Sequence, residues 1–143
     1  MQLLIFLFSI LFSGITPSWL TDMNQAATAA KKENKLILLN FSGSDWCGPC
    51  IKMEKEIFAH AAFEEYAAKN LVLVNADFPR LKKNRLNEKQ TALNEALADK
   101  YNKTGIFPLT LLLDANGKVL QKWEGVPAAN ATSFLTLLKN PAK

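Results

Sequence analysis

The chain has 143 residues, of which 49% are hydrophobic, and its 17 Lys and Arg against 13 Asp and Glu give a net charge of +4. This length is typical of one domain that can bury a sizeable core, and the balance of apolar and charged residues excludes an intrinsically disordered chain. The basic residues are scattered, with no basic stripe interleaved with aromatic residues, so no nucleic-acid partner is expected.

An apolar segment precedes the rest of the chain. Leu3 to Ile15 carries no charged residue, and the first acidic or basic residue is Asp22. As a helix this run spans roughly 20 Å, which is short of the roughly 30 Å hydrocarbon core of a bilayer. That length is typical of the hydrophobic region of a secretory signal peptide.

The residues after this segment predict where such a signal ends. Thr16 and Ser18 supply small side chains at the positions that favour cleavage before Trp19. We therefore interpret residues 1–18 as a signal peptide and residues 19–143 as the mature domain. An uncleaved membrane anchor is the alternative. In both cases the folded part is expected to be periplasmic or secreted, in an oxidising compartment.

The rest of the chain alternates between helical and strand patterns. Helix formers and helically spaced apolar residues predict helices over residues 22–34, 51–58, 62–69, 87–101 and 129–138. Apolar runs bounded by polar or turn residues predict strands over residues 36–41, 71–77, 109–113 and 118–123. The last two strands flank an Asn-Gly turn and are expected to form an antiparallel hairpin. Strand–helix–strand units require parallel pairing, so the predicted fold is α/β, with a mixed central sheet and helices on both faces.

The only two cysteines lie three residues apart in the stretch Trp46-Cys47-Gly48-Pro49-Cys50. Cys47 follows the loop after the first predicted strand and is expected at the first turn of a helix. There, unpaired N–H groups and the helix dipole lower the pKa of a thiol. Cys50 lies one turn further along the same face, at a separation that a disulfide can bridge. Pro49 is compatible with a first helical turn, and Gly48 leaves the attacking sulfur free of side-chain bulk.

Three roles besides redox exchange are open to the cysteine pair. A zinc site needs about four ligands, and the chain offers two cysteines and one histidine, so no metal is expected. That histidine, His60, is expected at an exposed helix end. A purely structural disulfide across so short a loop would remove little entropy from the unfolded chain. Two inert buried thiols would not need a helix terminus. Redox exchange is the favoured interpretation, and it requires no cofactor.

The densest basic cluster is the stretch from Arg80 to Arg85, which reads RLKKNR. It lies in a polar segment after the predicted strand over residues 71–77. A solvated surface is the simplest interpretation of this cluster. An electrostatic docking patch for an acidic partner is the alternative.

From Trp19 to Leu138 the sequence resembles the thioredoxin superfamily. The stretch WCGPC that ends at Cys50 is identical to that of thioredoxin, and Phe107-Pro108 resembles the family's cis-proline loop. The stretch NFSGSDWC that ends at Cys47, and the polar insertion after Asp77, resemble exported thioredoxin-like proteins of bacteria. The resemblance implies a thioredoxin-like fold.

The resemblance also implies roles for the residues of the site. Cys47 would attack a substrate disulfide and form a mixed disulfide, and the more buried Cys50 would resolve it. Pro108, with a cis peptide bond, would present the backbone at Phe107 to a bound peptide. Trp46 would pack over the site and limit water, with simple core packing as the alternative.

One position departs from thioredoxin. The buried aspartate that assists proton transfer at the resolving cysteine of thioredoxin aligns with Asn40, and asparagine cannot take up a proton in this range. Water or Asp45 is then left as the proton acceptor. Asp45 is otherwise expected to be a solvated loop carboxylate.

The favoured function is that of an exported thiol–disulfide oxidoreductase that reduces protein disulfides, because the Gly-Pro pair resembles that of the reducing members of the family. Its expected partners are disulfide-containing client proteins and a membrane-bound thiol electron donor, and the protein is expected to be a monomer. One rival is a disulfide isomerase or oxidase with the same residues. The other is a thioredoxin-fold binding module in which the cysteines are incidental.

Overall fold

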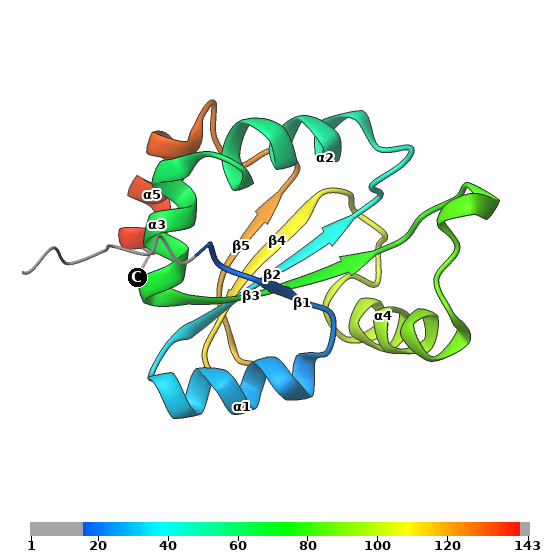
Figure 1. Ribbon diagram of the computed structural model, residues 1–143, viewed down its shortest axis with the longest axis horizontal. Helices are drawn as coiled ribbons and strands as arrows, with labels where there is room; N and C mark the ends of the chain where they lie inside the picture. The colour runs from blue at the N-terminus through cyan, green and yellow to red at the C-terminus, as the bar shows by residue number, and fades with distance from the viewer. Residues whose placement is uncertain (1–15, 141–143) are drawn as a thin grey trace, which may run out of the picture.

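A five-stranded sheet forms the centre of the protein (Figure 1). The computed structural model describes residues 16–140, so most of the predicted signal peptide lies outside the described residues. The strands are β1 (Trp19–Leu20), β2 (Leu36–Ser42), β3 (Leu71–Asp77), β4 (Leu109–Leu113) and β5 (Val119–Glu124).

The helices begin where polar side chains cap them. Asp22, Asn87 and Asn130 each accept a hydrogen bond from a backbone N–H in the first turn of the helix that follows, and His60 Nδ1 does the same. His60 therefore lies at an exposed helix end, as expected. The helices are α1 (Met23–Glu33), α2 (Gly48–Met53), the π-helical turn η1 (Glu54–Phe58), α3 (Ala61–Asn70), the 3-10 turn η2 (Lys82–Asn84), α4 (Glu88–Tyr101) and α5 (Ala131–Lys139).

The predicted mixed sheet is confirmed. Its strand order is β1-β3-β2-β4-β5, with β1 and β2 parallel to β3, β4 antiparallel to β2, and β5 antiparallel to β4 in the expected hairpin. Sequence patterns missed β1, because two residues paired with Leu73 and Val74 carry no periodic signal. The other predicted elements are observed, with ends that differ by no more than three residues.

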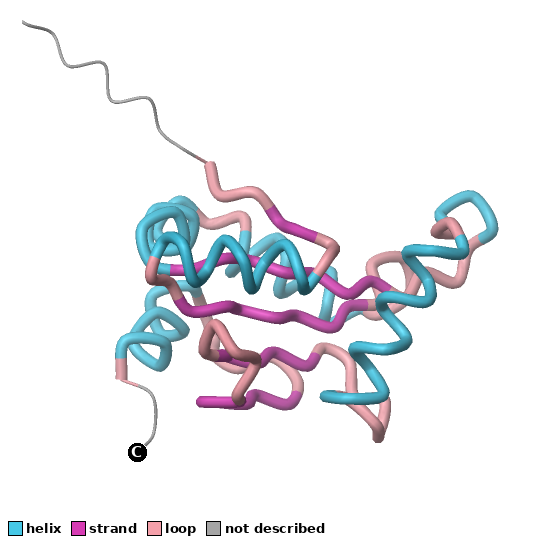
Figure 2. The backbone as a smooth tube through the Cα atoms, turned by 90° about the horizontal axis from the view of Figure 1, so that it is seen from below, coloured by secondary structure: helices cyan, strands magenta, loops and turns pink. Residues whose placement is uncertain are grey.

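The side chains of β2 alternate between two apolar layers. Ile37, Leu39 and Phe41 belong to the layer that α1 and α4 cover, whereas Leu38 belongs to the layer under α2, α3 and α5. Figure 1 shows these two groups of helices on opposite sides of the sheet, and Figure 2 shows α1 aligned with the strands and α4 inclined to them. The predicted helices on both faces of the sheet are therefore confirmed. The alternation of side chains along β2 decides which of its residues face α2.

Aromatic rings fix the end of the segment that carries the cysteines. Phe58 in η1 lies 4.9 Å from Trp19 and 5.1 Å from Phe63, measured between ring centroids. Phe134 of α5 packs against Phe63 and Trp123 in the same layer. Such pairs add stability beyond their buried area, so η1 is held on both sides.

The predicted helix over residues 51–58 is observed as two parts. It begins at Gly48 as an α-helix and continues from Glu54 as a π-helical turn. The adjacent residues Ile57 and Phe58 are both buried. A π-helical turn bonds over five residues, so it spreads a turn over more positions and allows both side chains to face the core.

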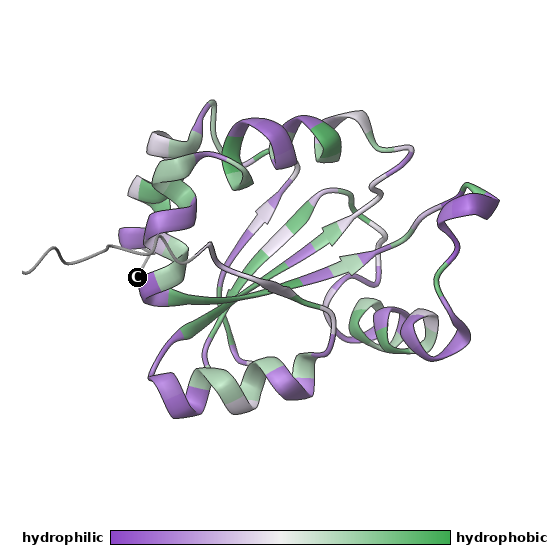
Figure 3. Ribbon diagram, in the orientation of Figure 1, coloured by the Kyte–Doolittle hydropathy of each residue, from purple (hydrophilic) through white to green (hydrophobic). Residues whose placement is uncertain are grey.

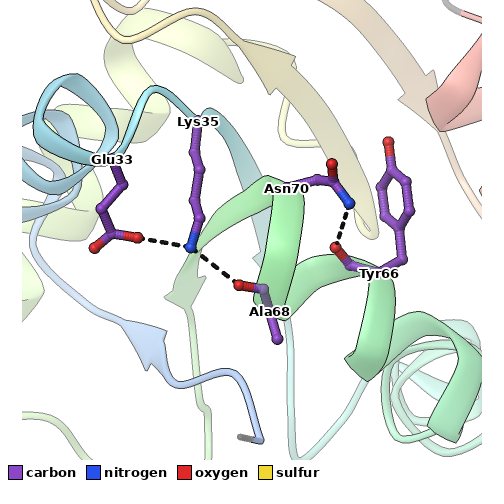
Figure 4. Close-up of polar contacts among 5 residues, drawn as sticks. All are labelled: Glu33, Lys35, Tyr66, Ala68 and Asn70. Carbon is purple, nitrogen blue, oxygen red and sulfur yellow. Dashed lines mark hydrogen bonds and ion pairs between the residues drawn. The ribbon is translucent and has the colours of Figure 1, made fainter.

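A lysine connects the start of β2 to the end of α3 (Figure 4). Lys35 Nζ donates to the carbonyl of Ala68 at 3.0 Å and pairs with the Glu33 carboxylate at 2.6 Å. The hydrogen bond and charge of Lys35 lower the pKa of Glu33. Nearby, Asn70 Nδ2 donates to the carbonyl of Tyr66 at 2.9 Å. The bond from Lys35 satisfies the carbonyl of Ala68, which lies in the last turn of α3 and has no intrahelical partner.

Hydrophobic residues are concentrated in the inner strands, and the outer faces of the helices are hydrophilic (Figure 3). The edge strand β5 is more exposed, with no residue that is fully buried. Within residues 16–140, none of the helices has the length and apolar character needed to cross a bilayer.

Candidate active site

Cys47 and Cys50 form a disulfide at the N-terminus of α2, with 5.2 Å between their Cα atoms. Cys47 is the N-cap residue, and the backbone N–H of Cys50 donates to its Sγ at 3.3 Å. Pro49 lies in the first turn, as expected. Gly48 is exposed, and a Cβ there would meet nothing within 4 Å, so the surface beside the disulfide is open.

The position of the two sulfurs distinguishes them better than their burial does. Cys50 was expected to be the more buried, but the exposed fractions are 5% for Cys47 and 4% for Cys50. After reduction, a Cys47 thiolate would keep the Cys50 N–H and the positive end of the helix dipole, and both favour negative charge. Cys50 lies one turn further in, where no such donors are free.

Trp46 is held in place by three neighbours. Its Nε1 donates to the carbonyl of Phe78 at 2.7 Å, and its ring lies 5.4 Å from that of Phe107. A Cβ on Gly43 would collide with the indole, so glycine is needed there for this packing. Trp46 is partly exposed and lies between the disulfide loop and the cis-proline loop. This position favours a role at the site over simple core packing.

The Phe107–Pro108 peptide bond is cis, as expected. Pro108 is buried and Phe107 is partly exposed. The preceding turn is closed by Asn102, whose Nδ2 donates to the carbonyl of Ile106 at 2.8 Å and whose Oδ1 accepts from the N–H of Ile106 at 2.9 Å. The carbonyl of Pro108 accepts from the N–H of Gly125. Sequence patterns missed Asn102, because a paired side-chain amide in a loop has no motif.

Asp45 lies at the surface, as expected of a loop carboxylate, and it is also a structural residue. It accepts hydrogen bonds from the N–H groups of Arg80 and Leu81, at 2.9 and 3.0 Å, and from Asn84 Nδ2 at 3.0 Å. The bond from Arg80, followed by that from Asn84, lowers the pKa of Asp45. A carboxylate with three donors and a lowered pKa is a poor proton acceptor, so these contacts disfavour a role of Asp45 as the base.

Residues 78–87, which we call the arm, are attached to the active-site loop at further points. The Arg80 guanidinium lies 3.6 Å from the ring centroid of Trp46. At the end of β3, the carboxylate of Asp77 accepts from the N–H and the hydroxyl of Ser44, at 2.9 and 2.6 Å. The base of the arm, at Phe78 and Arg80, is thus part of the active-site wall.

Asn40 lies in a row of three polar side chains across the sheet. Its Nδ2 donates to Asn75 Oδ1, and its Oδ1 accepts from the Thr110 hydroxyl, both at 3.2 Å. These residues are register partners on β3, β2 and β4. Because Leu38 faces α2, the alternation places Asn40 on the same face, where it is only 5% exposed. Asn40 is thus a buried neutral group beneath the cysteine helix.

A cavity of about 350 Å³ lies beside Cys50. It contains one carboxylate, Glu54, which follows Cys50 by four residues on the same helix. Glu54 keeps contact with solvent, yet partial burial, followed by the charge of Glu64, raises its pKa. Sequence analysis missed Glu54, although its spacing from Cys50 could have indicated it. The lining residues are Trp19, Ser42, Ser44, Cys50, Ile51, Glu54, Lys55 and Asn75.

Metal ligands are not clustered in the part of the chain that the structure describes. Among residues 16–140, no group of three or more His, Cys, Asp or Glu side chains is placed to hold a metal ion.

Comparisons with known proteins agree with this geometry. A family model described as a thioredoxin-like domain matches residues 23–140. The chain is 36% identical over 119 residues to the disulfide bond reductase DsbH of Chlamydia pneumoniae, in a match that covers 83% of this chain and 69% of that protein.

Solved structures give the same result. A structure of the DsbH oxidoreductase superposes with a TM-score of 0.79 and 32% identity, over 88% of this chain and 84% of that chain. A thioredoxin from Thermus thermophilus superposes with a TM-score of 0.66 over 88% of this chain and 87% of that chain. The second match is 14% identical and shows the shared fold alone.

We expect Asp45→Asn to loosen the arm. The pKa of Asp45 is lowered in the folded protein, so its ionised form stabilises the arm above the ordinary value of 3.8, and this contribution is lost as the pH falls through the folded pKa. Asparagine lacks the charge and one acceptor oxygen. Amide hydrogen exchange at Arg80 and Leu81 should therefore become about tenfold faster at neutral pH.

Asp22→Asn is the matched control, because Asp22 caps α1, outside the arm. It should leave exchange at Arg80 and Leu81 unchanged. In the wild type, the protection of these amides should decrease once the pH is lower than about 3.8, because the Asp45 carboxylate becomes protonated. In Asp45→Asn, protection should show no such pH-dependent decrease. Unchanged protection in Asp45→Asn would contradict the anchoring role of the carboxylate.

Proposed function

The chain belongs to the thioredoxin-like domain family, as the sequence predicted, and we propose that it is a thiol–disulfide oxidoreductase that reduces protein disulfides through Cys47 and Cys50. The observation that carries the proposal is the disulfide at the N-terminus of α2, with an open surface beside it. Reduction is the favoured direction, because the relative at 36% identity is named a disulfide bond reductase.

The first step is attack by Cys47. Its thiolate displaces one sulfur of the client disulfide, so a bond forms between Cys47 Sγ and the other client sulfur, and the displaced sulfur leaves as a thiolate. The N-cap position and the N–H of Cys50 support the thiolate before the attack.

The second step is attack by Cys50 on Cys47 Sγ. It forms the disulfide present in the structure, breaks the mixed disulfide and releases the second client thiol. In total the client disulfide gains two electrons and two protons, and the protein dithiol loses them. A thiol electron donor must then reduce the Cys47–Cys50 disulfide again.

The client chain would lie along the cis-proline loop. Phe107 is partly exposed beside Trp46, and Pro108 is held in the sheet layer behind it. An extended peptide could pair with the backbone at Phe107, which would bring its disulfide towards the open surface beside Cys47.

Glu54 is the proposed proton acceptor for Cys50. Asn40 cannot take up a proton, and Asp45 is bound to the arm with a lowered pKa. Glu54 lines the same cavity as Cys50, and its raised pKa brings it closer to that of a thiol, which favours proton transfer. The cavity is large enough to hold a water, and Ser42, Ser44 and Asn75 in its lining are polar partners for one. Lys55 also lines this cavity, and Glu64 faces Glu54 from α3.

We further propose that the protein is exported and works as a monomer on disulfide-containing clients, with a membrane-bound thiol donor supplying electrons. Export rests on the apolar segment from Leu3 to Ile15. Cleavage before Trp19 would leave β1 intact, since this strand begins at that residue. The mass of the exported protein should correspond to a chain that starts at Trp19. A mature, membrane-free protein that retains Met1 would exclude this cleavage.

The reduced protein should reduce insulin, and each cysteine should be needed in a different way. Cys50→Ser should trap mixed disulfides with clients, because Cys47 can attack but nothing resolves the product. Cys47→Ser should trap none, and neither variant should turn over. Gel analysis of the trapped species and the turbidity of reduced insulin give the two readouts. A wild-type protein that leaves insulin intact would favour the non-catalytic binding module instead, and equal trapping by both variants would overturn the assigned roles.

Glu54→Gln should slow resolution by about tenfold or more and leave the attack by Cys47 unchanged. Because the folded pKa of Glu54 is raised, its ionised form does not stabilise the fold, so the variant should be at least as stable as the wild type at neutral pH. Stopped-flow reduction of a peptide disulfide separates the two steps.

The matched control is Glu56→Gln. Glu56 lies on the same helical segment, pairs with Lys52 and does not line the cavity. It should leave both steps unchanged. If Glu54→Gln resolves the mixed disulfide at the wild-type rate throughout the range of about pH 6–9, where raised carboxyl and thiol pKa values fall, Glu54 is not the proton acceptor.

A further inference from the structure

The arm contains the chain's unbalanced positive charge. Its charged residues are Arg80, Lys82, Lys83 and Arg85, and residues 78–87 include no Asp or Glu. The whole chain has 17 Lys and Arg against 13 Asp and Glu, for a net charge of +4. The four arm cations therefore equal the entire excess, and the rest of the chain is balanced.

These cations are exposed and available. All four side chains lie at the surface, and within residues 16–140 no ion pair involves them. Asp45 accepts hydrogen bonds from the backbone of the arm and from Asn84, at the base of the arm. Its charge offsets that of Arg80 in part, and Glu88 and Glu95, which line a surface pocket together with Arg85, offset the charge of Arg85 in part. Lys82 and Lys83 lie in η2, between these two positions.

The arm is fixed next to the disulfide. Arg80 covers the ring of Trp46, which directly precedes Cys47, and Trp46 Nε1 donates to the carbonyl of Phe78. At the other side of its base, Asn94 Nδ2 donates to the carbonyl of Asp77 at 2.8 Å. Figure 1 shows the arm projecting beside the loop that leads into α2, and Figure 3 shows its tip as hydrophilic.

We propose that the arm is a docking surface that selects client segments with acidic residues next to the disulfide. The inference rests on the proposed reductase function and specifies its substrate class. Charges fixed at the rim of a site steer an oppositely charged partner and raise its association rate. The anchored base gives these charges a constant position relative to Cys47, so they favour acidic residues at one side of the reacting bond.

The occupant is an acidic polypeptide because the arm lacks the parts that nucleic acids need. Single strands bind where aromatic rings are free to stack with bases. The ring of Trp46 is covered by Arg80, and the ring of Phe78 packs between those of Phe41 and Phe107. The arm therefore binds through charge alone. Since the proposed clients of the protein are polypeptides, an acidic polypeptide is the partner that fits it.

The test compares two fluorogenic peptide disulfides that differ only in their flanks, Asp-Glu in one and Asn-Gln in the other. Each is reduced by the pre-reduced wild-type protein under single-turnover conditions. At about 20 mM salt the acidic peptide should react about tenfold faster, and at about 300 mM salt the two rates should converge as the charges are screened.

The variant Lys82→Gln, Lys83→Gln, Arg85→Gln should lose this preference and reduce the neutral peptide at the wild-type rate. Arg80 is kept because it contacts Trp46. The matched control, Lys31→Gln, Lys32→Gln, Lys118→Gln, removes the same charge from exposed positions outside the arm and should keep the preference. Unchanged melting temperatures would show that both variants fold.

Retention of the preference in the arm variant, or equal loss in both variants, would overturn the inference. Arm-dependent sedimentation with vesicles of anionic phosphatidylglycerol, without any peptide preference, would assign the arm to a membrane surface and overturn it as well. A wild-type protein that reduces neither peptide overturns the proposed function. In that case, fluorescence anisotropy of a cysteine-free acidic peptide decides the inference, since arm-dependent binding supports it and equal binding to the arm variant refutes it.

Discussion

The N-terminus of α2 is the constraint on which the rest of the site depends. A helix begins with backbone N–H groups that have no intrahelical partner, and here one of them, from Cys50, points at the Cys47 sulfur. This geometry requires α2 to be held firmly at the end of β2. The aromatic rings around Phe58 hold its far end, and Gly43 allows Trp46 to close against its near end. Much of the packing around α2 therefore serves to position one sulfur.

The face of the sheet under α2 changes character along the strands. Leu38 lies in the apolar layer, and two residues later Asn40 begins a row of neutral hydrogen-bonded groups. A buried carboxylate at this point would lose its hydration and cost free energy unless it was fully bonded. The neutral row avoids this cost but provides no proton acceptor. Glu54 lies on the helix above, where partial burial raises its pKa while the carboxylate keeps contact with solvent.

The sequence predicted those features that local patterns determine. Apolar runs predicted the strands after β1, and the short spacing of the cysteines predicted a redox pair at a helix start. It could not predict features that depend on contacts distant in the chain. Asp45 has a role only because the arm, about 35 residues later, brings N–H groups to it, as hydrogen bonds spanning 35 and 36 residues show. The strand at Trp19 likewise exists only through its pairing with β3.

The same desolvation cost explains why the reacting sulfurs and the charges of the arm occupy different places. Sulfur exchange needs a site with little water, where the helix dipole and a single N–H have a large effect on a thiolate. Cations placed inside such a site would lose their hydration at a cost in free energy, and they would pair with the thiolate in place of the client disulfide. Cations on an anchored projection keep their hydration, and Arg80, 3.6 Å from the ring centroid of Trp46, is closer to the site than the Debye length of about 8 Å at physiological salt. The Asp45 contacts that fix the arm thus allow one chain to combine a nearly dry disulfide, about 5% exposed, with a strongly charged rim.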